Sequence, residues 1–184
     1  MRDDLDEILL NEDQIQRRLD ELAGEIQRDY VEKDLTLVAV LTGSVMFVAD
    51  LLRRLPMRLR LDYIGVSSYH GETRSTGTLT VRKTLRLDVR GRDVLVVDDI
   101  LDTGLTLSKI REMVQKLQPR SLKFGVLLEK DVPHHEEFKA DYVGFHIPNK
   151  FVVGYGLDYW ERYRNLPYVG TLKPSVYEGD RPVL

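Results

Sequence analysis

Apolar residues recur at steps of three and four positions near the start of the chain. This spacing is that of one face of an amphipathic helix, and it predicts a helix over residues 11–30. Asn11 and Gln14 have the residue types and spacing of an N-terminal capping pair. The apolar face of this helix consists of Ile15, Leu19, Leu22, Ile26 and Tyr30.

Short apolar runs follow, and helical patterns separate several of them. The runs at 35–41 and 93–97 predict buried strands that lead into helices at 45–55 and 105–117. Further strands are predicted at 59–69, 79–89, 121–129, 141–147 and 151–155. Strands that alternate with helices predict an α/β protein with a mostly parallel central sheet flanked by helices. At 184 residues, a single domain over 1–184 is the default.

The stretch HGETRSTGTL has almost no apolar content. It lies between the strands predicted at 59–69 and 79–89, which would face each other as a long hairpin. A polar tip of this kind predicts an exposed, flexible loop over about 68–80.

Composition removes several classes of function. The chain is 42% hydrophobic and 31% charged, as in ordinary globular proteins, and no apolar run reaches the roughly 18 residues of a membrane span. The acidic start lacks the layout of a signal peptide, and the absence of cysteine fits a reducing cytoplasm. A net charge of −3 argues against a protein that coats nucleic acid.

The stretch VLVVDDILDTGLTL, residues 94–107, combines a buried strand, three aspartates and a helix start. Thr103, Gly104 and Thr106 would lie at the helix N-terminus, where free N–H groups, hydroxyls and the helix dipole favour an anion. The stretch lacks the lysine of a Walker A loop, so a single phosphate suits it better than a triphosphate.

The aspartates add a second requirement. Asp98 and Asp99 can accept hydrogen bonds from vicinal hydroxyls and supply oxygen ligands to Mg²⁺. Asp102, one turn further on, can act as a base, although a plain helix N-cap is the alternative for this residue. A ribose 5-phosphate meets these requirements. It has a phosphate at one end and a diol in the middle, and the proton to be removed lies beyond the diol.

The same stretch closely resembles the 5-phosphoribosyl-1-pyrophosphate (PRPP) binding motif of type I phosphoribosyltransferases. The segments LTGSVMFVADL, SSYHGETRSTG, LLEK and DYVGFHIPNKFVVGYGLDYWERYRNLPYVGTL are similar to the bacterial hypoxanthine-guanine branch of that family. The resemblance covers about residues 35–172. It implies a small hood beside the central sheet, and transfer of the phosphoribosyl group to hypoxanthine or guanine in purine salvage.

The resemblance assigns roles on the ribose side. Asp98 and Asp99 would bind the ribose hydroxyls and the Mg²⁺ carried by PRPP, and Asp102 would be the base near purine N7. The 5-phosphate would be bound by Asp102, Thr103, Gly104, Leu105 and Thr106.

Pyrophosphate would be bound by Thr42, Gly43 and Arg164. Relatives often have a cis peptide bond in the 42–43 loop, which turns an amide toward pyrophosphate at a cost of about 3 kcal/mol. Some relatives have lysine where this chain has Thr42, so a lysine contribution is lost. Ser68 and Tyr69 would begin the flexible loop that closes over PRPP and excludes water.

The purine would contact the side chains of Lys130 and Phe151 and the backbone of Val152, while Asp158 matches a ligand of a second Mg²⁺. Lys130 would donate to the purine 6-oxygen; an ammonium group is donor-only, which disfavours adenine with its 6-amino group. By residue type alone, Phe151 is instead expected in the core.

Three alternatives stay open: a xanthine-preferring enzyme, an RNA-binding regulator of pyrimidine genes on the same fold, and a catalytically dead relative. The regulators lack the KFVVGYGLDY segment and usually have a basic RNA-binding face. Relatives of the enzyme self-associate, so a homodimer or homotetramer is expected.

Overall fold

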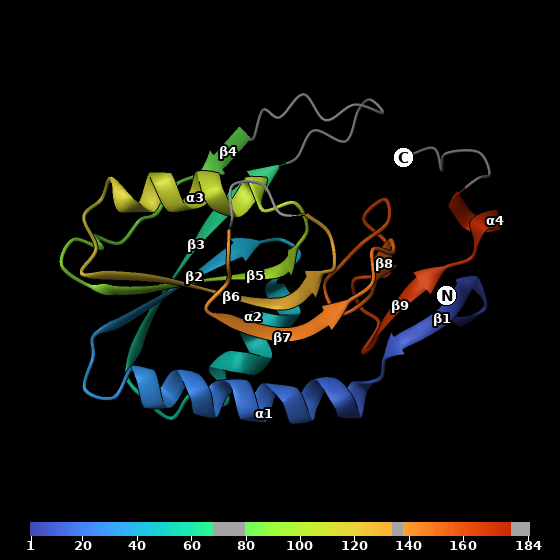
Figure 1. The fold of residues 1–184 in the computed structure, drawn as a ribbon, viewed down its shortest axis with the longest axis horizontal. Coiled ribbons are helices and arrows are strands. Elements are labelled where there is room, and N and C mark those ends of the chain that lie inside the picture. The colour runs from blue at the N-terminus through green and yellow to red at the C-terminus, as the bar shows by residue number, and fades with distance from the viewer. Residues whose placement is uncertain (68–79, 134–137, 178–184) are drawn as a thin grey trace.

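The computed structural model describes residues 1–67, 80–133 and 138–177. Its central sheet has the strand order β4-β3-β2-β5-β6-β7 (Figure 1). All neighbours in this sheet are parallel except β4, which pairs antiparallel with β3. The predicted, mostly parallel sheet is therefore confirmed. The strands are Leu35–Leu41 (β2), Leu59–Ser67 (β3), Thr80–Lys83 (β4), Asp93–Leu101 (β5), Ser121–Lys130 (β6) and Tyr142–Ile147 (β7).

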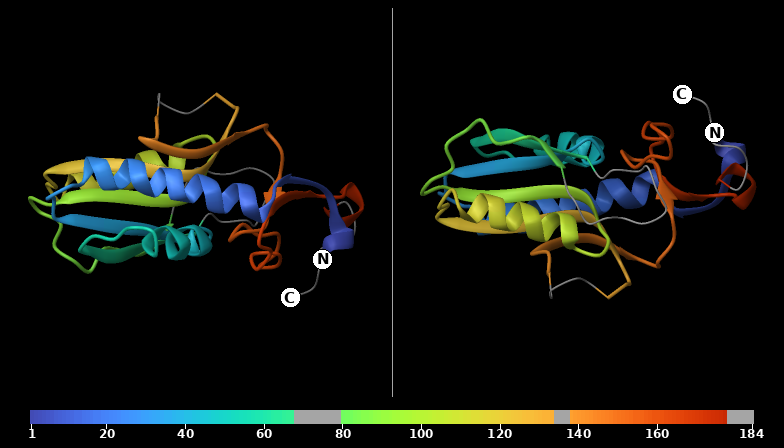
Figure 2. Two further views of the ribbon diagram at one scale, coloured as in Figure 1. Left: turned by 90° about the horizontal axis from the view of Figure 1, so that it is seen from below. Right: turned by 90° about the horizontal axis from the view of Figure 1, so that it is seen from above.

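Helices cover both faces of the sheet. The helices α1 (Glu12–Asp29) and α2 (Val45–Leu52) share one apolar core with the sheet, and α3 (Leu105–Gln115) packs into a second core. Figure 2 shows α1 in front of the sheet from one side and α3 in front of it from the other. Among the described residues, no helix combines the length and the apolar character that crossing a bilayer requires.

The first helix forms as its sequence pattern predicts. Asn11 Oδ1 accepts from the Gln14 N–H at 2.9 Å, and Gln14 Oε1 accepts from the Asn11 N–H at 2.8 Å. This capping box satisfies two N–H groups at the helix start. All five residues of the predicted apolar face are buried, so both the helix and its orientation are confirmed.

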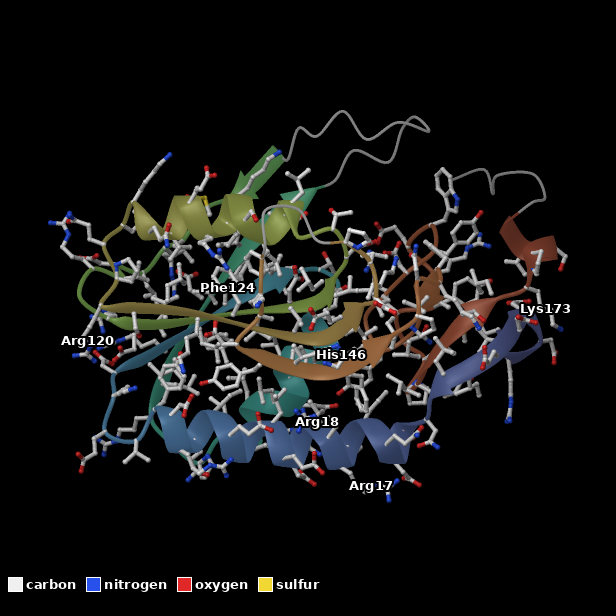
Figure 3. The ribbon with its side chains drawn as sticks, viewed as in Figure 1. Arg17, Arg18, Arg120, Phe124, His146 and Lys173 are labelled. Atoms are coloured by element: carbon white, nitrogen blue, oxygen red, sulfur yellow. The ribbon has the colours of Figure 1, made fainter. Side chains whose placement is uncertain are left out.

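One residue of α1 ties the helix to the edge of the sheet. Arg18 donates from Nε to the Gly144 carbonyl and from Nη2 to the Val143 carbonyl, both at 2.9 Å. Because β7 ends the strand order, these carbonyls belong to an edge strand. Figure 3 shows Arg18 between α1 and β7. The guanidinium therefore covers part of an edge that would otherwise be open to pairing with another chain.

A second, smaller sheet has the order β1-β9-β8, from Leu5–Leu10 (β1), Val169–Leu172 (β9) and Val152–Val153 (β8). This sheet and the connecting residues 154–168 are called the hood. In Figure 1 the hood lies beyond the carboxyl ends of β5, β6 and β7. The strands β1 and β9 and the short helix α4 (Pro174–Tyr177) were not predicted from sequence.

Three predicted strands differ clearly in length from the structure, and one of them, predicted at 151–155, is reduced to the two residues of β8. The strand β5 continues to Leu101 instead of ending at Val97, because its ladder with β6 continues through Asp98 and Ile100 to Leu101. The strand predicted at 79–89 is reduced to β4, Thr80–Lys83. Beyond β4, two backbone N–H groups turn toward a carboxylate on β3 rather than pairing with that strand.

That carboxylate is Asp62, which is 3% exposed. Its Oδ2 accepts from the N–H groups of Arg86 and Leu87, both at 2.7 Å, and its Oδ1 accepts from the Tyr63 N–H at 2.9 Å. Burial raises the pKa of Asp62, but the N–H donors outweigh burial and hold the pKa below its ordinary value. The carboxylate thus anchors the segment that returns from β4.

Asp62→Asn should lower the free energy of unfolding by about 2–4 kcal/mol, because the amide NH₂ would face N–H donors across a buried contact. Urea denaturation at neutral pH measures the loss. The depressed pKa means that the carboxylate stabilises the fold above about pH 4 and loses this contribution as the pH falls through the folded-state pKa. The difference between the two proteins should therefore shrink on acidification, and a constant difference would contradict the assignment.

Candidate active site

The two aspartates of the central motif lie on the last part of β5. Asp98 is 6% exposed and Asp99 is half-buried. Asp98 Oδ1 accepts from the Asp99 N–H and Asp99 Oδ1 from the Ile100 N–H, both at 2.9 Å. Burial, followed by the negative charge of Asp99, raises the pKa of Asp98 well above its ordinary value. Burial also raises the pKa of Asp99, while the charge of Arg164 acts in the opposite direction. A cation beside the pair would relieve this repulsion.

The helix after β5 begins as the sequence predicts. Gly104 precedes α3 with φ of +83°, in the left-handed region that glycine adopts without a Cβ penalty, and its carbonyl accepts from the Ser108 N–H at 2.9 Å. The first turn of α3 contains no acidic residue. The first N–H groups of a helix lack partners within it, so residues 102–106 present donors to an anion.

Asp102 and Lys130 are directly paired. Lys130 Nζ donates to Asp102 Oδ2 at 2.8 Å, with the lysine side chain 12% exposed and the aspartate side chain 50% exposed. The pairing follows from the sheet register, because Leu101 on β5 lies opposite Glu129 on β6 and each is followed by one member of the pair. Lys130 is therefore a largely covered, paired lysine and not a solvated surface residue.

The loop after β2 closes against the acid pair. Its cis peptide bond joins Leu41 to Thr42, one position before the 42–43 bond considered from the sequence. A Cβ on Gly43 would lie 1.8 Å from Asp99 Oδ2, so a larger residue here would displace the Asp99 carboxylate or the loop. The structure thus brings the predicted pyrophosphate loop into contact with a predicted ribose and Mg²⁺ ligand.

The hood approaches the same loop from the other side. A Cβ on Gly156, whose φ is +102°, would lie 2.0 Å from the Gly43 carbonyl oxygen. Arg164 Nη1 donates to the Gly156 carbonyl at 2.8 Å, and the Gly156 N–H donates to the Arg164 carbonyl at 2.9 Å. Gly43 is therefore enclosed between Asp99 and a hood segment fixed by Arg164.

Arg164 also contacts two carboxylates of the hood. Its Nη2 lies 3.0 Å from Asp158 Oδ1 and 2.8 Å from Glu161 Oε2. Within the described part of the chain, no three or more His, Asp or Glu side chains are grouped to hold a metal ion. Asp158 therefore does not form one preassembled cluster with Asp98 and Asp99.

Two predicted purine contacts, Phe151 and Val152, lie at the entry to β8. Phe151 is 54% exposed, and its ring packs edge-on against Tyr159 with the ring centroids 5.8 Å apart. The expectation from residue type, a core position for Phe151, is wrong. Val152 is buried on β8, where it pairs with Thr171 of β9. An exposed aromatic face beside a fixed backbone strand can stack on a planar ring and bond its edge.

Two groups of residues complete the comparison with the predictions. Ser68 and Tyr69 lie outside the described residues. Gly156 and Glu161 were not predicted, although the closely spaced glycines of VVGYGLDY were a signal for close backbone approach.

Comparison of the chain with known proteins shows which family it belongs to. A family profile described as "Phosphoribosyl transferase domain" matches residues 6–160. The hypoxanthine-guanine phosphoribosyltransferase of Staphylococcus aureus strain N315 is 48% identical over 177 residues, which are 96% of this chain and 99% of the relative.

Solved structures of the same family have the same fold as this chain. A hypoxanthine phosphoribosyltransferase from Staphylococcus aureus (tetragonal crystals) superposes with a TM-score of 0.91 at 48% identity, covering 96% of each chain. A hypoxanthine phosphoribosyltransferase from Trypanosoma cruzi gives a TM-score of 0.88 at 41% identity, covering 95% of this chain and 94% of that one. These relatives support the enzymatic interpretation over the RNA-binding alternative. The chain belongs to the hypoxanthine-guanine phosphoribosyltransferases of the phosphoribosyltransferase family.

Proposed function

We propose that the protein transfers the 5-phosphoribosyl group of PRPP to hypoxanthine, guanine or both, forming a nucleoside monophosphate and pyrophosphate. The observation that supports a 6-oxopurine as the acceptor is the contact between Lys130 Nζ and Asp102 Oδ2 at 2.8 Å. In a 6-oxopurine, O6 and N7 lie on the same edge of the ring. A cation and a carboxylate side by side match that edge, with Lys130 donating to O6 and Asp102 accepting the N7 proton.

The phosphoribosyl end is matched by the start of α3 and by the acid pair. The N–H groups of residues 102–106 would bind the 5-phosphate, and the carboxylates of Asp98 and Asp99 would accept from the ribose hydroxyls. These contacts fix the ribose while purine N9 attacks C1 and pyrophosphate leaves. Asp102 removes the proton from N7 as positive charge develops on the purine.

Mg²⁺ fits the acid pair, because Mg²⁺ sites commonly use one or two carboxylates together with substrate phosphates. Burial raises the pKa of both Asp98 and Asp99, and a cation beside them would favour their charged forms. When bound, the ion would neutralise charge on pyrophosphate. Asp158, from the hood, would supply a ligand to a second ion, and Arg164 together with residues 42–43 would bind pyrophosphate directly.

A single assay tests the proposal. Purified protein is incubated with PRPP, Mg²⁺ and one base at a time: hypoxanthine, guanine, xanthine or adenine. Nucleotide is expected from hypoxanthine or guanine, while adenine should give none because Lys130 cannot accept from its 6-amino group. If neither hypoxanthine nor guanine yields nucleotide, the proposed function is wrong.

A further inference from the structure

One nitrogen of the Arg164 guanidinium lies between two carboxylates. Nη2 carries two hydrogens, and it lies within bonding distance of two carboxylates, Asp158 Oδ1 at 3.0 Å and Glu161 Oε2 at 2.8 Å. Nη1 donates to the Gly156 carbonyl. Of the two, Glu161 accepts a hydrogen bond from Nη2, whereas Asp158 is paired with it by charge and proximity. A phosphate oxygen that approaches Nη2 must therefore compete with the Glu161 carboxylate for this nitrogen.

The two carboxylates are not equally held. The Asp158 side chain is 29% exposed, and its Oδ2 also accepts from the Glu161 N–H at 2.9 Å. The Glu161 side chain is 76% exposed, and it pairs with Arg164. Exposed ion pairs are weak because water screens them and a long side chain must be ordered. Glu161 is therefore the carboxylate that a charged ligand displaces at the lower cost.

The backbone keeps Glu161 near Arg164. Tyr159 and Arg162 exchange backbone hydrogen bonds of 3.2 and 3.1 Å around a two-residue turn. The central residues Trp160 and Glu161 have φ of +52° and +59°, a conformation that favours glycine and asparagine. Two large side chains in such a turn are unusual, and this turn places the Glu161 carboxylate on the guanidinium three residues later.

We propose that Glu161 is a displaceable counter-ion of Arg164 that competes with pyrophosphate. This inference rests on the proposed function. Without ligand, Glu161 neutralises and orients the guanidinium. Bound pyrophosphate, with several negative charges, replaces the single exposed carboxylate on Nη2. Glu161 thereby weakens pyrophosphate binding and favours release of this product, so that Arg164 does not retain it.

The test is the affinity of the whole protein for inorganic pyrophosphate in saturating Mg²⁺, measured by titration calorimetry. Glu161→Gln should lower the dissociation constant by about fivefold, the upper end of what an exposed ion pair contributes. The KM for PRPP should fall by a similar factor, whereas kcat should not rise. The ratio between the two proteins should approach one in about 1 M salt, where the Debye length is about 3 Å.

Glu32→Gln is the matched control, because it removes the same charge from an exposed residue before the amino end of β2, whereas the site lies at the carboxyl ends of the strands. Its pyrophosphate affinity should equal that of the wild type. Unchanged or weaker binding by a folded Glu161→Gln protein overturns the inference, even when the wild type forms nucleotide normally. Failure of the wild type to form nucleotide overturns the proposed function instead, and the inference with it.

Discussion

Replacing Gly43 by alanine should lower kcat/KM for nucleotide formation by about 100-fold or more, because misplacing reacting groups by about 1 Å has effects of this size. The added Cβ would lie 1.8 Å from Asp99 Oδ2 and 2.7 Å from its Cγ. Both distances are shorter than contacts between non-bonded atoms in proteins. Either the carboxylate or the loop must move. Both belong to the proposed ribose, Mg²⁺ and pyrophosphate contacts, so the loss should appear in catalysis more than in folding.

Gly125→Ala is the matched control for this substitution. A Cβ on Gly125, in β6, would meet Tyr142 Cβ at 3.7 Å, which is ordinary van der Waals contact. Steady-state kinetics and thermal unfolding of both variants separate the two effects. A Gly43→Ala enzyme with near-wild-type turnover would show that the Gly43–Asp99 contact is not required for catalysis.

Asp102→Asn should reduce kcat by about 100-fold, within the range that a general base contributes, with little change in the KM for PRPP. In the wild type, Lys130 Nζ lies 2.8 Å from the Asp102 carboxylate. Asparagine keeps an oxygen that can accept from Nζ, but it cannot accept the N7 proton. Single-turnover measurement of nucleotide formation is the appropriate readout, because slow product release could hide a loss in the chemical step.

Asp13→Asn provides the same chemical change at an exposed residue in the first turn of α1, which contributes none of the proposed ligand contacts. It should leave turnover unchanged. If Asp102→Asn also leaves turnover unchanged, Asp102 is not the base and its contact with Lys130 has another purpose.

The layered part of the fold could be predicted from sequence because its signals are local. The apolar spacing of α1 and the β-branched run of β2 specify an element and its buried side without reference to distant residues. The start of α3 could be placed for the same reason, since Gly104 and the threonines around it are adjacent in the chain.

The hood could not be predicted in this way. The sequence of β1, LDEILL, lacks regular alternation, and it becomes a strand because β9 pairs with it from the far end of the chain. The enclosure of Gly43 between Asp99 and Gly156 is equally non-local, as is the exposure of Phe151. Residue type sets the chemistry available at such positions, whereas tertiary packing decides which groups meet.

The pairing of β1 with β9 also determines when the fold can be completed during synthesis of the chain. Leu5 to Leu10 are translated about 10–30 s before their partners, Val169 to Leu172, at ordinary rates. All strands of the central sheet precede Pro148, so that sheet can form while β1 still waits for β9. A nascent chain that stops short of β9 therefore contains the start of α3, the proposed phosphate site, but cannot assemble the hood.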